Sequence, residues 1–110
     1  MRKCWFFAVV LLLAGLSCSR DQVKKPEVFL DEQQMIDVLA DSYLIEAQLN
    51  INKTKGIDVT EMQVEYYGQL FEHYGINDSI FEQNLYYYTH QPDILERIMD
   101  SLTNRFVSVQ

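Results

Sequence analysis

The spacing of apolar residues between residues 31 and 106 is the feature that most restricts what this chain can fold into. Apolar side chains recur there at steps of three and four residues, the period that places them on one face of an α-helix. The first series consists of Met35, Ile36, Leu39, Ala40, Tyr43, Ala47 and Ile51. No segment alternates apolar and polar residues as a half-buried strand does. The pattern therefore predicts an all-α domain.

Capping residues divide this region into about four helices joined by short loops. The predicted starts are Asp31, Asp58, Asn77 or Ser79, and Pro92. A glutamine or glutamate follows each of the first two starts after three residues, which is the spacing of a capping box. Gly75 predicts the end of the second helix, and proline suits the first turn of the fourth. Residues 31–110 are thus predicted to form a small antiparallel bundle whose third helix is short.

Residues 1–17 have the pattern of a secretory signal peptide. A basic start, Arg2-Lys3, precedes an apolar run at residues 4–16, and Gly15 and Ser17 supply small residues before Cys18. The run is shorter than the about 20 residues that a membrane-spanning helix needs. A cysteine directly after the cleavage position predicts a bacterial lipoprotein that begins, once processed, at lipidated Cys18. The same small residues would also suit an ordinary signal peptidase, which would release a secreted protein with a free thiol.

The cysteine count favours lipidation. The chain contains only Cys4 and Cys18, and the first is removed with the signal peptide. The remaining cysteine cannot form an intramolecular disulfide or a paired-cysteine zinc site. Residues 18–30 are predicted to be a flexible tether, and no aspartate directly follows Cys18. We therefore expect an anchor in the outer membrane, with the domain facing the periplasm.

The charge of the processed chain restricts its partners. Its 93 residues carry seven basic and 16 acidic side chains, a formal net charge of −9. Nucleic acid and anionic membrane surfaces are poor partners for such a domain. His73 and His90 are the only histidines, and no nucleophile motif or metal-ligand spacing is present. We expect no catalytic activity, no cofactor and no metal site, and the expected partners are the membrane, through Cys18, and another envelope protein.

Three consecutive tyrosines draw attention to the third predicted helix. Tyr88 is expected to face the core with Phe81, so Tyr86 and Tyr87 must point elsewhere. An exposed tyrosine pair is a frequent component of protein-binding surfaces. Asn84 is expected on the inward side, bonded to a backbone group at a helix end. These four polar residues are candidate binding residues.

Glu46 is the fifth candidate residue. On a helical wheel it falls at the edge of the apolar face of the first predicted helix. A carboxylate there needs a polar partner or access to water. We expect a hydrogen bond to a tyrosine, or to Arg97 or Arg105, within the bundle. The alternative is that Glu46 helps to bind a ligand.

Several short motifs, taken in order, resemble a known family. They are Glu46-Ala47, Tyr66-Tyr67, Phe81, Asn84, Tyr87-Tyr88 and Pro92. Together they resemble DUF4296, a domain-of-unknown-function family of short helical lipoproteins from Bacteroidota, over about residues 26–106. Asn84 stands where the family would suggest a serine, so no role that needs a hydroxyl carries over. The resemblance implies an exported helical lipoprotein and no mechanism.

Two functions remain open on this reading. The first is a lipid-anchored, non-enzymatic module that binds another envelope protein or helps to assemble one. The second is a small-ligand carrier with a pocket between helices, lined by tyrosines and Glu46. An enclosed cavity containing Glu46 would favour the carrier. A filled core with Tyr86 and Tyr87 exposed would favour the interaction module.

Overall fold

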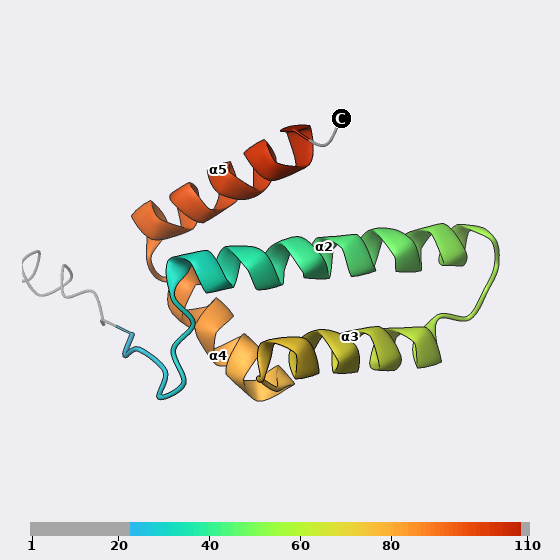
Figure 1. Cartoon of the computed structure of the whole chain (residues 1–110), viewed down its shortest axis with the longest axis horizontal. Helices are drawn as coiled ribbons and strands as arrows, with labels where there is room; N and C mark the ends of the chain where they lie inside the picture. The colour runs from blue at the N-terminus through green and yellow to red at the C-terminus, as the bar shows by residue number, and fades with distance from the viewer. Residues whose placement is uncertain (1–22, 109–110) are drawn as a thin grey trace, which may run out of the picture.

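A computed structural model describes residues 23–108 of the chain (Figure 1). They form four helices: α2 (Glu32–Thr54), α3 (Thr60–Tyr74), α4 (Asp78–Thr89) and α5 (Pro92–Ser108). No strand occurs within these residues, so the predicted all-α bundle of four helices is confirmed. The predicted signal peptide and Cys18 lie outside the described residues. Among the helices of the described part, none has the length and hydropathy needed to span a membrane.

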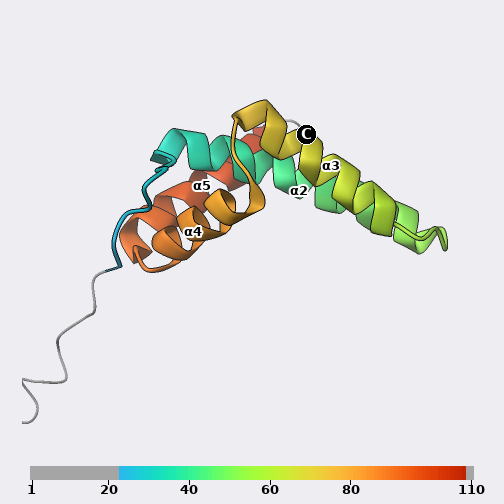
Figure 2. The ribbon, with the colours of Figure 1, turned by 90° about the horizontal axis from the view of Figure 1, so that it is seen from below.

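The longest helix, α2, is the element against which the others assemble. Its partners are α3, which returns antiparallel to it, and α5, which runs in the same direction as α2 (Figure 1). The short α4 leads from α3 to α5 and packs on α5. The tip of the α2–α3 hairpin extends beyond α4 and α5 in both views (Figures 1 and 2). The main core therefore lies around the N-terminal half of α2.

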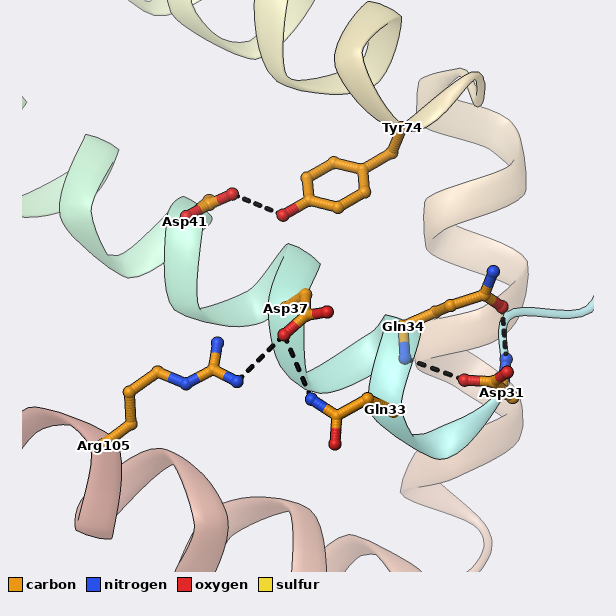
Figure 3. Close-up of polar contacts among 7 residues, drawn as sticks. All are labelled: Asp31, Gln33, Gln34, Asp37, Asp41, Tyr74 and Arg105. Atoms are coloured by element: carbon orange, nitrogen blue, oxygen red, sulfur yellow. Dashed lines mark hydrogen bonds and ion pairs between the residues drawn. The ribbon is translucent and has the colours of Figure 1, made fainter.

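Two of the predicted helix starts have the caps that the sequence indicates. The Asp31 carboxylate accepts from the Gln34 amide at 2.8 Å, and the Gln34 side chain accepts from the Asp31 amide at 3.0 Å (Figure 3). This is a complete capping box. At the start of α4, Asn77 Oδ1 accepts from the Ile80 amide at 2.8 Å. Local hydrogen bonds thus fix where α2 and α4 begin.

The second predicted capping box, at Asp58 and Glu61, is wrong. The Asp58 carboxylate accepts from the amide and the hydroxyl of Thr60, two residues on, at 3.0 and 2.7 Å. This turn precedes the helix, so α3 begins at Thr60. Its N-cap is Val59, which is buried and makes no side-chain cap. The Asp58 carboxylate, one position before the N-cap, thus accepts from the amide of the first residue of α3.

The core joins the segment before α2 to three of the helices. Its buried members are Leu30, Met35, Ile36, Leu39, Ala40, Tyr87, Tyr88, Ile98 and Leu102. The predicted apolar face of α2 is therefore correct for Met35, Ile36, Leu39 and Ala40, whereas Tyr43 is 42% exposed. In the second half the prediction is wrong, because Ala47 and Ile51 are exposed and Leu49 is buried instead. Among the described elements, α3 alone lies beside this part of α2, so a different face of α2 is covered (Figure 1).

Polar contacts hold α3 and α5 on opposite sides of α2. The Tyr74 hydroxyl of α3 donates to Asp41 at 2.5 Å, and Arg105 of α5 donates to Asp37 at 2.9 Å (Figure 3). The two aspartates are one helical turn apart on α2. Burial, followed by the hydrogen bond to Asp41, raises the pKa of Tyr74 to about 12. The protonated phenol is thus the form that the fold favours.

Candidate functional site

Asn84 fixes the segment that enters the domain. Its side chain is 0% exposed; Oδ1 accepts from the Leu30 amide at 2.8 Å, and Nδ2 donates to the carbonyls of Val28 and Ile80 at 2.9 and 2.8 Å. The predicted inward position is confirmed. Two of its three bonds go to the extended segment before α2, and not to the end of a helix as expected. Asn84 thus satisfies backbone groups that have no helical partner.

Tyr88 completes this attachment. Its hydroxyl donates to the Leu30 carbonyl at 2.6 Å, and its ring stacks on Phe29 with centroids 5.9 Å apart. Its predicted place in the core is confirmed, and burial raises its pKa to about 12. The flexible tether predicted through residue 30 is therefore wrong for residues 28–30. These residues belong to the folded domain because α4 binds their backbone.

The expected exposed pair, Tyr86 and Tyr87, is not a pair. Tyr86 is 58% exposed, whereas Tyr87 is only 7% exposed. The Phe29 ring meets the Tyr87 ring edge-on at 5.5 Å, so the entering segment covers a side chain that α4 alone would expose. Tyr86 contacts His90, with ring centroids 4.4 Å apart. The prediction is wrong for Tyr87, and Tyr86 alone remains on the surface.

Glu46 is exposed and bonds across to α3. Its carboxylate accepts from the Tyr67 hydroxyl at 2.5 Å, which confirms the expected tyrosine partner. Arg97 and Arg105 pair instead with two other carboxylates of α2. Burial, and then the hydrogen bond and charge of Glu46, raise the pKa of Tyr67 to about 12. The bond fixes the orientation of the Tyr67 ring.

That ring forms part of an open groove of about 1030 Å³ between α3 and α4. The apolar lining consists of Val64, Tyr67, Phe71, Ile76, Phe81 and Leu85. One aromatic contact connects the two walls, since the Phe71 centroid of α3 lies 5.7 Å from that of Phe81 of α4. Within α3, the Phe71 centroid lies 5.9 Å from that of Tyr67. Phe81 also packs against the buried core. The groove floor is therefore continuous with the core, and the residues that the structure describes leave it partly exposed.

Sequence reasoning missed this groove. Val64, Tyr67 and Phe71 follow one another at steps of three and four residues, which is a helical series of their own. The series lies beside the stripe of α3 that contains buried Leu70 and packs on α2. Two adjoining apolar series on one helix signal two contacts. Phe71 of this series contacts Phe81 of α4, whereas Val64 is 73% exposed and has no such cover within the described part of the chain.

The rim of the groove is acidic. Glu72, Asp78 and Glu82 line it, and all three are exposed. No lysine, arginine or histidine occurs among the described residues that line it. Charges of one sign along a cleft concentrate the field and attract ligands of opposite charge. The site thus combines an apolar floor with a negative rim.

The histidines lie in aromatic contacts outside this groove. His73 meets Tyr74 edge-on at 4.9 Å, and His90 forms the C-cap of α4 beside Tyr86. Within residues 23–108, no three histidine, cysteine, aspartate or glutamate side chains come together as a metal site. Among the described residues, the groove between α3 and α4 is the feature that combines a defined shape with a defined charge.

The fold and the groove define a small all-α domain with an open, partly apolar groove between α3 and α4. Comparison with family models identifies the family of this domain, because residues 26–109 match the domain of unknown function DUF4296. The chain belongs to the DUF4296 family, as its short motifs indicate. No curated protein and no solved structure matches the chain.

Proposed function

We propose that this chain is a lipid-anchored module of the bacterial cell envelope that binds another protein through the α3–α4 groove. The observation that carries the proposal is the uncovered apolar floor of that groove. Grooves with an apolar lining and a few polar groups at the edge are typical of sites that bind ligands or peptide segments. The floor adjoins the core, so a partner that covers it would extend the packing already present.

The shape of the site favours a protein partner over a carried small ligand. Pockets for small ligands enclose most of the ligand surface. Here the groove is open. Glu46 is exposed and does not line the groove, although its carboxylate accepts from the Tyr67 hydroxyl. A long, open and partly apolar groove between helices matches the way in which folded domains bind peptide segments.

The anchor would keep this groove near the membrane. Val28, whose carbonyl accepts from Asn84, lies ten positions after Cys18 in the sequence. Fully extended, ten residues reach about 35 Å. A lipidated Cys18 would therefore hold the domain within about that distance of the bilayer, which suits a partner that is itself a membrane or envelope protein.

Cys18→Ser tests the anchor. We expect the variant to lose lipid labelling and to move from the membrane fraction to the aqueous fraction, because the buried lipid chains supply the attachment. Cys4→Ser is the matched control, since that residue lies in the predicted signal peptide and should leave membrane attachment intact. A Cys18→Ser protein that stays in the membrane fraction would contradict the lipoprotein proposal.

Chemical crosslinking in native membranes, followed by mass spectrometry, tests the interaction. We expect a reproducible partner that Val64→Asp removes, because this change places a charge on the groove floor. Val107→Asp is the matched control, at a valine of α5 that is 64% exposed. If no partner is recovered with the lipidated wild-type chain, the interaction proposal is wrong and the carrier must be reconsidered.

A further inference from the structure

We propose that the occupant of the α3–α4 groove is a basic amphipathic helix of the partner protein. This inference depends on the proposed interaction function and names the chemistry of its partner. Three independent features of the groove support it: its course along a helix, the sign of its rim and the glycine at its centre.

The course of the groove suits a helix. Its α3 wall is formed by one face of the helix, on which Val64, Gly68 and Phe71 lie at steps of four and three residues. Such rows form the ridges and grooves into which a second helix packs. The 15 residues of α3 span about 22 Å, which is the length of about four helical turns. A partner helix of similar length would cover the floor.

The negative charge of the rim indicates that the partner helix is basic. Three carboxylates, Glu72, Asp78 and Glu82, border the floor, and no cationic side chain of the described lining balances them. An acidic segment would be repelled, whereas lysine and arginine flanking an apolar stripe would meet opposite charge. Because the carboxylates are exposed, their attraction should weaken as salt is added.

Gly68 has no role within the described fold. It lies inside α3, where glycine is less favourable than alanine. A Cβ atom built at this position meets nothing within 4 Å. Packing within the domain therefore does not require glycine here. The missing side chain leaves the α3 backbone accessible in the centre of the groove, and a second helix can approach closely there.

The test uses the full lipidated chain in detergent micelles and two labelled peptides as long as α3. Both carry leucine at helical spacing; one has lysine at the remaining positions and the other has glutamate. Fluorescence anisotropy should show binding of the lysine peptide, weakened by salt, and no binding of the glutamate peptide. Equal binding of both peptides, or no binding of the lysine peptide, would overturn the proposal.

Matched charge variants locate the binding site. The groove variant combines Glu72→Gln, Asp78→Asn and Glu82→Gln. The control combines Asp93→Asn, Glu96→Gln and Asp100→Asn on exposed positions of α5, with the same change in net charge. We expect about a tenfold or greater loss of affinity for the groove variant and less than about twofold for the control. Equal losses would mean that only the overall charge matters, which contradicts a built site.

Substitutions of Gly68 distinguish an effect on binding from an effect on folding. Gly68→Ala should raise the melting temperature and yet weaken binding, and Gly68→Leu should abolish binding, because each side chain occupies the space of the approaching helix. Binding that survives Gly68→Leu would overturn the proposal. If the peptides fail to bind but a Val64-dependent partner is still captured in membranes, this inference is wrong and the interaction function stands.

Discussion

At the scale of residues, the side chains of α4 that carry the family resemblance have a structural task. Asn84 and Tyr88 bond the backbone of residues 28–30, and Tyr87 packs on the ring of Phe29. Together they convert the end of a predicted tether into part of the core. The sequence indicates that Asn84 and Tyr88 face inward, because they share a helical face with Phe81. It does not show their partners, since those lie more than 50 residues away along the chain.

Asn84→Ala should lower the free energy of unfolding by about 2–3 kcal/mol, because a buried amide and carbonyl would lose their partners. The control is Asn104→Ala, at an exposed position of α5, where we expect a change within about 0.5 kcal/mol. Urea unfolding of both variants measures the difference. Equal stability of the two would show that Asn84 does not hold the entering segment.

Tyr67, Tyr74 and Tyr88 should ionise near pH 12, two of them because burial is reinforced by a bonded carboxylate. The ordinary pKa is 10.0, so the fold prefers the protonated phenols. Their contribution to stability is therefore complete below about pH 10 and is lost as the pH rises towards 12. Ultraviolet titration should show these late phenols, and Tyr67→Phe should remove one. Ionisation of all seven tyrosines near pH 10 would contradict these contacts.

At the scale of elements, the structural features that could be predicted are those that depend on residues close together in the sequence. The cap of α2 at Asp31 and that of α4 at Asn77 follow from side chains three residues from their partners. The burial of Leu49 in place of Ile51 does not, because it depends on which helix covers the distal half of α2. The hydrogen bond of Glu46 was predictable only in part. A tyrosine partner could be expected from the sequence, but that this partner is Tyr67 depends on how α2 and α3 are aligned.

The glycines of α3 give an element-scale prediction with opposite signs. Gly68→Ala should raise the free energy of unfolding by about 0.5–1 kcal/mol, because helical backbone and open space accept the methyl group. Gly75→Ala should lower it by about 1 kcal/mol, because Gly75 ends α3 with φ of 66°, which is unfavourable for other residues. Thermal and urea unfolding measure both. A loss of stability in Gly68→Ala would mean that this glycine is needed by the domain itself.

At the scale of the whole molecule, the chain joins a predicted membrane anchor to a domain with an open groove between α3 and α4. The anchor is a prediction from the sequence, based on a local pattern around Cys18. The groove could not be predicted, because it arises where α3 and α4 meet at an angle that the sequence does not specify. In the sequence, the only indication of its floor is the second apolar series of α3, Val64, Tyr67 and Phe71.

The most direct test of this account is photo-crosslinking in living cells from single positions of the lipidated chain. A photoreactive residue at Val64, on the groove floor, should attach to a partner protein. The same residue at Val107, on α5, should not, although both valines are exposed. Attachment from Val64 alone would establish the groove as the contact face of the anchored protein. Attachment from Val107 alone, or from neither position, would contradict it.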